Sequence, residues 1–283
     1  MYHTDANRKD FRMKIVLIGP GRAGMALSLA STEAGHQVVA VMARDLDVAA
    51  MAASKIGAEA VTWGSDVPRA DMAFIAVRDD AIATVAKDLT GHLDRVGAAV
   101  HLSGLRSIDA LSPLGNAGLQ TGSFHPLQTL PTPEAGASRL AGAWMAVTAP
   151  EPLRQSLFEL AESIGAVPFD LADDVKPLYH AAAAAAANFS LISLAMAHDL
   201  FAAAGVPFEA AQPLVEAVVA NAFDLGPRHA LTGPVSRGDV ATVVAQLDAV
   251  RTEVPGWADD FAGLIAMLAR LSHRAEEFRE VLE

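Results

Sequence analysis

Cysteine is missing from this chain of 283 residues, and aromatic and charged side chains are few. Without cysteine the chain cannot form disulfides, thiolate metal sites or a cysteine nucleophile, and we expect no bound metal. Aromatic residues make up 6% and charged residues 19% of the chain, whereas hydrophobic residues make up 52%, which predicts a globular protein. Basic residues are outnumbered by acidic ones, and the net charge of −12 argues against a nucleic acid or an anionic membrane as partner.

The start of the chain has no pattern of a secretion signal. Residues 1–12 contain no apolar core, so we interpret them as a flexible tail and expect the protein in the cytoplasm. One segment, Leu178–Gly205, is long and rich in alanine and could be mistaken for a membrane span. It contains polar side chains such as Asn188 and Asp199, and alanine is only weakly lipophilic. We therefore predict a buried, tightly packed helix.

The chain is organised around residues 13–26, where a strand, a glycine turn and a helix follow one another. Ile15–Ile18 is a short apolar run rich in β-branched residues, which predicts a buried strand. Gly19 would make the tight turn, Gly21 would let phosphates approach the backbone, and Gly24 would let the helix pack closely on the strand. The helix start would then bind a pyrophosphate through free N–H groups. Unless this is a plain glycine turn, it predicts a dinucleotide site formed by Gly19, Pro20, Gly21, Arg22, Ala23 and Gly24.

The end of the second predicted strand, Gln37–Met42, indicates which dinucleotide binds. NAD-binding domains usually place Asp or Glu there, because a carboxylate accepts hydrogen bonds from the ribose 2′-OH. This chain has Ala43 and Arg44 instead. Arg44 is placed to pair with a 2′-phosphate, which favours NADP. The alternative is a solvated loop arginine, because Asp45 beside it weakens the positive field.

Strands and helices alternate over residues 13–172, including a helix predicted at Leu46–Gly57 and a short third strand at Glu59–Val61. The apolar run Asp71–Val77 predicts a strand, and Asp79 or Asp80 fits the cap of the helix that follows. The carboxyl end of this strand adds Ala76, Val77 and Arg78 to the predicted cofactor site. Further strands are predicted at 98–102, 119–124, 143–148 and 167–171, with a helix near 152–164. The predicted fold class is α/β, with a doubly wound, mainly parallel Rossmann sheet.

No alternating strand pattern appears after residue 172. Four helices are predicted instead, over residues 177–204, 208–225, 239–250 and 257–282. The sequence therefore predicts a second, all-α domain over residues 173–283.

Two strand ends carry side chains that could contact a substrate. The Ser103 hydroxyl and the Gly104 N–H would point towards the nicotinamide end of the site and could hold a carboxylate or carbonyl, unless Ser103 only caps the next turn. His125 precedes Pro126 and is therefore held extended. It could act as an acid, a substrate hydrogen-bond donor or a nicotinamide contact, or make structural hydrogen bonds. Gln128 follows in the same stretch and is a further substrate-binding candidate.

The long alanine-rich helix carries the other catalytic candidates. His180 leads as proton donor, because its unperturbed pKa near 6.5 suits transfer at neutral pH; the alternative is a core histidine. Asn188 would lie roughly 12 Å farther along a regular helix, so both cannot touch one reacting carbon. Arg237, in the loop 230–239, could clamp an anionic substrate bidentately or form an ordinary ion pair with an acid such as Asp239.

Four motifs together resemble a known family of two-domain proteins. They are G-P-G-R-A-G at 19–24, S-F-H-P-L-Q-T at 123–129, Y-H-A-A-A at 179–183 and L-T-G-P-V-S-R-G-D at 231–239. That family joins a Rossmann-like domain to a helical C-terminal domain of unknown function and is assigned to NADP oxidoreductases, sometimes dependent on a deazaflavin coenzyme. It is structurally similar to 6-phosphogluconate dehydrogenase, 3-hydroxyisobutyrate dehydrogenase, pyrroline-5-carboxylate reductase and ketopantoate reductase.

The resemblance implies hydride transfer from NADPH to a small carbonyl or imine at the domain interface. It also implies a small anionic metabolite as substrate, ketopantoate being one candidate, and a homodimer formed through the helical substrate domain. The better-known dehydrogenases place Lys and, one turn later, Asn on the long helix, where this chain has His180 and Ala184. The resemblance therefore implies that His180 donates the proton, unless Lys176 reaches in, and that Arg237 or Ser103 holds a carboxylate. A catalytically silent NADP sensor or scaffold is the alternative, because the Lys-Asn pair is missing.

Overall fold

A computed structural model describes residues 11–282 and divides the chain into two compact units, Met1–Ala185 and Ala186–Glu283. The sequence suggests a boundary after residue 172, whereas the first unit extends through helix α7 (Lys176–Ala184). The predicted tail lies outside the described residues except for its last two. Of these, Phe11 packs edge-on against His36 with ring centroids 5.5 Å apart.

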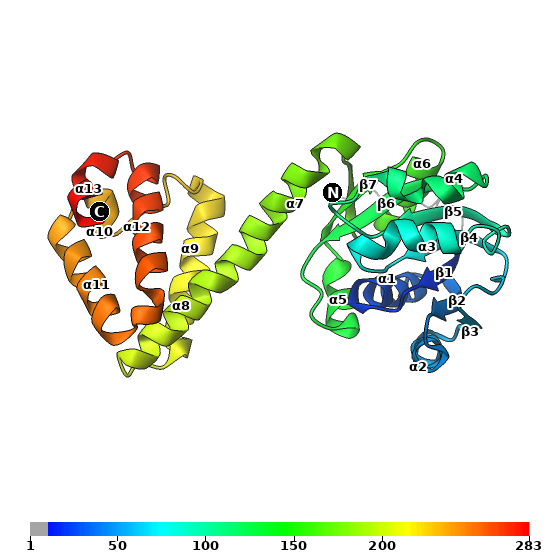
Figure 1. The fold of residues 1–283 in the computed structure, drawn as a ribbon, viewed down its shortest axis with the longest axis horizontal. Coiled ribbons are helices and arrows are strands. Elements are labelled where there is room, and N and C mark those ends of the chain that lie inside the picture. Colours follow the sequence, from blue (N-terminus) through cyan, green and yellow to red (C-terminus); the bar gives the residue numbers. More distant parts are fainter. Residues whose placement is uncertain (1–10, 283) are drawn as a thin grey trace, which may run out of the picture. The chain divides into compact units, whose positions relative to one another are not determined.

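The first unit contains one eight-stranded sheet in the order β3-β2-β1-β4-β5-β6-β7-β8 (Figure 1). The first six strands run parallel to one another, so their carboxyl ends meet at one edge. The chain order reverses between β1 and β4, which is the switch point where ligands bind in open α/β sheets. The strands are β1 (Lys14–Ile18), β2 (Gln37–Ala43), β3 (Glu59–Thr62), β4 (Ala70–Ile75), β5 (Val96–His101), β6 (Gln120–Leu127), β7 (Trp144–Thr148) and β8 (Val167–Asp170).

Helices cover both faces of the sheet. Along β1, Ile15 and Leu17 join one hydrophobic core while Val16 and Ile18 join the other, as the two-residue period of a strand requires. The first core is closed by α1 (Arg22–Glu33), α2 (Leu46–Ile56), α5 (Pro133–Leu140) and α6 (Leu153–Ser163), and the second by α3 (Ile82–Asp88) and α4 (Ser112–Asn116). The predicted doubly wound α/β fold is confirmed.

The strand β7 departs from the parallel pattern. It pairs antiparallel with β6, with Trp144 opposite Leu127, because the chain turns back through α5 at the end where β6 finishes. β8 then pairs parallel with β7. The sequence reading missed α5 altogether. It is anchored by Gly136, where an added Cβ would lie 2.8 Å from Ala26 Cβ of α1, so the two helices approach closely.

The second unit is helical, as predicted. Its small core consists of Val235, Val243, Leu247, Ile265, Ala269 and Phe278. Its helices are α8 (Ser190–Ala203), α9 (Gln212–Leu225), α10 (Pro234–Arg237), α11 (Val240–Glu253), α12 (Ala258–Leu271) and α13 (Arg279–Leu282). The prediction of a single helix over 257–282 is wrong. Helix α12 ends at Leu271, and His273 two residues later adopts a left-handed conformation with φ of 60°.

The long alanine-rich helix is not the regular, buried helix that the sequence predicts. Residues Ala185–Phe189 form a π-helical turn between α7 and α8, so an α-helical count of the angle from His180 to Asn188 fails. Asp173–Ala203 is long and apolar enough to cross a membrane by length and composition alone, and 6% of its most apolar window is buried. The prediction of tight packing is therefore wrong for the single chain, since little of the chain covers this helix.

Candidate functional site

The glycine turn after β1 has the geometry expected of a dinucleotide-binding turn. Gly19 has φ of 85°, and its N–H donates to the carbonyl of Met42 at 2.9 Å. A Cβ at Gly24 would lie 2.6 Å from Ala76 Cβ, so this glycine permits the close packing of α1. A Cβ at Gly21 would meet only the Ala76 carbonyl oxygen, at 3.8 Å. The space above Gly21 is therefore open, whereas Gly19 and Gly24 are tightly packed.

The N-terminus of α1 offers its free N–H groups to this space. Its cap residue Gly21 has no side chain, and the first turn of α1 contains no acidic residue. An anion bound there would gain hydrogen bonds and the favourable end of the helix dipole. Arg22 and Ala23 supply the first two N–H groups of the helix. The glycine turn thus fits a pyrophosphate.

A cavity of about 460 Å³ extends from the glycine turn across the switch point. It reaches the ends of β1, β2, β3 and β4 and one face of α3. Its lining includes the predicted cofactor residues Gly19, Pro20, Gly21, Ala43, Arg44, Ala76, Val77 and Arg78, and also Asp45, Val48, Trp63, Ala81, Thr84, Val85 and Asp88. Most of the predicted cofactor residues therefore lie around one space.

The two arginines that line this cavity, Arg44 and Arg78, differ in whether they form an ion pair. Arg78 binds both carboxylate oxygens of Asp80, at 3.2 and 3.0 Å. Arg44 is exposed and has no ion-pair partner among residues 11–282. Asp45 points its carboxylate at the backbone, since it caps α2 by accepting from the N–H of Asp47 at 2.8 Å. Arg44 is thus a cation in the lining of this cavity with no ion pair among the described residues.

Ser103, which follows β5, forms a hydrogen bond with Asp79, which follows β4. The Ser103 hydroxyl donates to Asp79 Oδ2 at 2.7 Å and accepts from the N–H groups of Leu105 and Arg106 at 3.1 and 3.0 Å. The geometry therefore favours the capping alternative for Ser103. The predicted cap at Asp79 or Asp80 is wrong, because neither side chain caps α3.

His125, near the end of β6, forms a hydrogen bond with Tyr179 of α7. Its Nδ1 lies 2.8 Å from the Tyr179 hydroxyl oxygen. The imidazole ring rests on the backbone of Gly104, where a Cβ would come within 2.7 Å of Cε1. Tyr179 also contacts the ring of Phe169 in β8, at a centroid distance of 6.1 Å. Both rings are therefore held at the carboxyl edge of the sheet.

Burial keeps this pair uncharged. Burial, reinforced by electrostatic repulsion from the neighbouring His180, lowers the pKa of His125 to about 4. Burial also raises the pKa of the Tyr179 hydroxyl to about 12. Between pH 4 and pH 12 both side chains are neutral, and two arrangements are open to them. Either the Tyr179 hydroxyl donates to Nδ1 and Nε2 carries the imidazole hydrogen, or Nδ1–H donates to the Tyr179 oxygen and the hydroxyl hydrogen is free.

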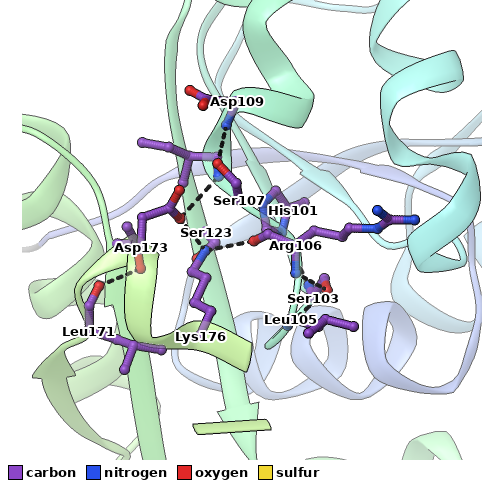
Figure 2. Close-up of polar contacts among 12 residues, drawn as sticks. His101, Ser103, Leu105, Arg106, Ser107, Asp109, Ser123, Leu171, Asp173 and Lys176 are labelled. Atoms are coloured by element: carbon purple, nitrogen blue, oxygen red, sulfur yellow. Dashed lines mark hydrogen bonds and ion pairs between the residues drawn. The ribbon is translucent and has the colours of Figure 1, made fainter. Parts of the chain in front are cut away.

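Lys176, at the start of α7, is almost fully buried, with 1% of its surface exposed (Figure 2). Its ammonium donates to the Ser123 hydroxyl of β6 at 2.7 Å and to the carbonyl of Arg106 at 2.9 Å, and it pairs with Asp173 at 3.0 Å. Burial lowers the pKa of Lys176, and Asp173 opposes that shift. These three acceptors use all three ammonium hydrogens.

His101, at the end of β5, is fully buried beside this cluster. Its Nδ1 accepts from the N–H of Ser103 at 3.2 Å. Burial first, and then the charge of Lys176, lower the pKa of His101 to about 4. The imidazole is therefore neutral at physiological pH.

Two histidines with pKa values near 4 make stability depend on pH. Between pH 6.5 and 4 the unfolded chain takes up protons on His101 and His125 that the folded chain does not, so the free energy of unfolding falls as pH falls. Each histidine contributes about 1.4 kcal/mol per pH unit within that window.

In His101→Asn, whose Oδ1 can replace Nδ1 as acceptor, the free energy of unfolding in urea should fall less steeply from pH 6 to 4.5 than in the wild type. His198→Asn, at a side chain 60% exposed, should retain the slope; equal slopes for wild type and His101→Asn would contradict the assignment.

The remaining predicted residues lie outside the Lys176 cluster and the His125–Tyr179 pair. His180 is exposed on α7, next to Tyr179. Asn188 is exposed in the π-helical turn and belongs to the second unit. Gln128 is exposed, and its side-chain Oε1 accepts a hydrogen bond from the Thr129 N–H at 2.8 Å. Arg237 is exposed. The pKa of Asp239, whose carboxylate caps α11, is lowered first by hydrogen bonds from Thr242 and to a smaller extent by the charge of Arg237.

Several residues of the cavity and of the Lys176 and His125 clusters were not candidates from the sequence, among them Tyr179, Asp79 and Trp63. The position of Tyr179 three residues after Lys176 was the available signal, because residues three apart share a helix face. Asp79 was assigned to a cap, and Trp63 follows a strand in a stretch with no recognisable motif.

Two family models match the chain, one for each part. A Rossmann-like domain matches residues 1–126, and the domain of unknown function DUF2520 matches residues 143–263. These matches confirm the pair of domains that the sequence motifs resemble. No curated protein matches the sequence.

Solved structures of similar fold cover almost the whole chain. A proposed NADP oxidoreductase from Bacteroides fragilis has a TM-score of 0.78 at 22% identity, over 93% of this chain and 100% of that one. An imine reductase from Myxococcus stipitatus, in complex with NADP+, has a TM-score of 0.64 at 19% identity, over 93% and 96%. A 1-pyrroline-5-carboxylate reductase from Streptococcus pyogenes has a TM-score of 0.60 at 16% identity, over 92% and 98%. At these identities the likeness establishes a shared fold.

Proposed function

We propose that this chain, which joins a Rossmann-like domain to a DUF2520 domain, is an NADP-dependent oxidoreductase that reduces a small carbonyl or imine compound. The observation that carries the proposal is the layout of the carboxyl edge of the sheet. An open glycine turn lies at the switch point, and an uncharged His125–Tyr179 pair lies at the end of β6 on the same edge. An enzyme that reduces a carbonyl or imine with NADPH needs both a site for the nucleotide and a group that protonates the substrate.

The residues around the glycine turn fit NADP. The open space above Gly21 and the free N–H groups of α1 suit the pyrophosphate, and Arg44 suits a 2′-phosphate. When bound, the cofactor would supply the hydride. Structures with this fold include an imine reductase solved with NADP+, which supports the same cofactor here.

The Tyr179 hydroxyl is the proton donor that the geometry favours. If His125 Nδ1–H donates to the Tyr179 oxygen, the hydroxyl hydrogen of Tyr179 is free to move to a substrate oxygen or nitrogen. The Nδ1 proton of His125 can then move to the tyrosine oxygen while Nε2 takes up a proton from solvent, so the Tyr179 hydroxyl is restored and the imidazole stays neutral. His180, the sequence candidate, remains the second proposal, because its side chain is exposed on the same helix. Arg237 and Asn188, which lie in the second unit, remain candidates for substrate binding and catalysis.

The direct test is NADPH oxidation in the presence of ketopantoate, other 2-oxo acids and cyclic imines such as 1-pyrroline-5-carboxylate. We expect turnover with at least one of these classes and none without substrate. NADPH binding without turnover of any of them would favour the alternative, a catalytically silent sensor or scaffold. No NADPH binding at all would contradict both proposals.

We expect a preference for NADPH over NADH that depends on Arg44. Replacing Arg44 with Ala should weaken NADPH binding roughly tenfold, the effect of losing one charge-assisted contact to phosphate, and leave NADH binding unchanged. Isothermal titration with both cofactors measures this. Arg251→Ala is the control, because Arg251 is an exposed arginine paired with Asp248 and does not line this cavity, so its loss should leave binding of both cofactors unchanged. Equal weakening for both cofactors would remove the 2′-phosphate role.

We also propose a homodimer formed through the helical unit. Apolar side chains on α8 and α9 are unusually exposed, including Leu191 (63%), Leu214 (63%) and Phe223 (87%). Exposed patches of this kind usually mark a protein interface. Replacing Phe223 with Asp should raise the dimer dissociation constant at least about tenfold in sedimentation equilibrium. A wild-type protein that stays monomeric at every concentration would contradict the proposal.

The other expected properties follow from the same proposal. The proposed substrate is a small anionic metabolite, and the proposed compartment is the cytoplasm. A deazaflavin coenzyme and the absence of nucleic-acid and membrane partners stay predictions.

A further inference from the structure

Lys176 is the most deeply buried charged side chain of the described cluster, yet it has no hydrogen left for a substrate. Its ammonium is bound by Ser123, the carbonyl of Arg106 and the carboxylate of Asp173 (Figure 2). Burying an ammonium costs free energy, which is offset only when every donor is satisfied. The three acceptors come from three different segments: β6, the loop after β5 and the turn before α7. Lys176 therefore connects these segments at one point.

The Lys176 contact and the tyrosine contact join the same two elements. Lys176 and Tyr179 are three residues apart on α7, so they share one helix face. Ser123 and His125 are two residues apart on β6, so they share one face of the strand. The Lys176–Ser123 hydrogen bond, at 2.7 Å, and the Tyr179–His125 hydrogen bond, at 2.8 Å, are thus two neighbouring links between α7 and β6.

The second link is weaker by itself. It joins two neutral side chains, whereas the first joins the Lys176 cation to the Ser123 hydroxyl. The His125 ring rests directly on the backbone of Gly104, which limits how far it can move to follow Tyr179. A shift of the start of α7 would therefore lengthen the Tyr179–His125 hydrogen bond.

We propose that Lys176 is a positioning residue: its ammonium fixes the first turn of α7 on β6 and so holds the Tyr179 hydroxyl against Nδ1 of His125. The lysine acts through Tyr179 and does not give up a proton to a substrate. The consequence for turnover rests on the proposed function, whereas the consequence for the hydrogen bond does not.

The two tyrosines of the chain make the test specific. The sequence contains only Tyr2 and Tyr179, so Tyr2→Phe leaves a single tyrosine. In that background, protein labelled with 13C at the tyrosine Cζ gives one NMR signal, whose shift reports the hydrogen bond of the hydroxyl. His125→Phe defines the signal of the unpaired hydroxyl. We expect Lys176→Met to move the signal most of the way to that value.

A second variant and a control keep the test decisive. Ser123→Ala removes one acceptor and leaves the lysine paired with Asp173, so it should fold even if Lys176→Met does not, and it should move the signal in the same direction. Lys55→Met breaks the exposed ion pair of Lys55 with Glu134 and should leave the signal unchanged. An unmoved signal in folded Lys176→Met, or in Ser123→Ala when Lys176→Met does not fold, would overturn the proposal.

The kinetic readout separates this inference from the proposed function. Once a substrate is found, Lys176→Met should lower kcat roughly 10- to 100-fold, the loss expected for a displaced catalytic group, with the KM for NADPH unchanged. A larger loss of kcat with an unmoved tyrosine signal would make Lys176 itself the acid and overturn the positioning role. Absence of turnover in the wild type would remove the proposed function only, because the NMR signals would still decide the role of Lys176.

Discussion

Replacing Tyr179 with Phe should reduce turnover about 100-fold or more while NADPH binds as tightly as to the wild type. The reason is that a positioned proton donor contributes about 10²- to 10⁴-fold to a rate, and the Tyr179 hydroxyl is paired with neutral His125 at 2.8 Å. The phenylalanine ring keeps the contact with Phe169, so the fold should be retained. Steady-state kinetics with the substrate found in the panel, together with titration of NADPH, measure both quantities.

His180→Ala is the matched variant, because His180 is the next residue of the same helix and is exposed. If His180 only adjusts the electrostatics around His125, its removal should change kcat less than about fivefold. The opposite pattern, full activity in Tyr179→Phe and a collapse of kcat in His180→Ala, would return the proton donor to the residue that the sequence favours. Loss of both activities would indicate that the two side chains act together.

Gly21 and Gly24 should respond in opposite ways to the same substitution by valine. At Gly24 the new Cβ would lie 2.6 Å from Ala76 Cβ and 2.8 Å from Leu17 Cδ1, so α1 must move off the sheet. Overpacking of this kind costs about 1 to 3 kcal/mol and occasionally more. At Gly21 the Cβ has only the Ala76 carbonyl oxygen within 4 Å, at 3.8 Å. Gly21→Val should therefore remain folded but fill the space where the pyrophosphate would lie.

Urea unfolding and NADPH titration of the two variants test this contrast. We expect Gly24→Val to lose stability, and Gly21→Val to keep most of its stability but bind NADPH at least about 100-fold more weakly, as expected when phosphate hydrogen bonds are lost. Gly35→Val serves as a control for strain, because Gly35 has φ of 91° and no atom near its Cβ position. Unchanged NADPH affinity in Gly21→Val would contradict a pyrophosphate at this turn.

The sequence is sufficient to predict the sheet up to β6, because each strand is a short apolar run and each helix begins near a recognisable turn. It is not sufficient for the direction of β7. Direction depends on the end of the sheet to which the connection returns, and α5, which makes that connection, is a short helix with only Gly136, Ala137 and Leu140 buried. A helix with so little apolar surface gives a weak periodic signal.

The candidate site shows a similar limit. The glycine turn and Arg44 are set by their neighbours along the chain, so motifs are enough to predict that they lie around one cavity. The choice between Tyr179 and His180 depends on which face of α7 meets β6, and that is set by the burial of Lys176, a contact 53 residues apart in the sequence. Ser103 illustrates the same point, because its partner Asp79 comes from another strand end.

Trp63 gives this cavity an optical property. The indole lies in the wall of the space assigned to the cofactor, whereas Trp144 is on β7 and Trp257 donates its Nε1–H to Asp199 in the second unit. Reduced nicotinamide absorbs where tryptophan emits, so NADPH bound here would quench the emission of Trp63 by energy transfer. The affinity of every variant could then be followed by fluorescence on unlabelled protein, and Trp63→Phe would identify the part of the quenching that comes from this wall.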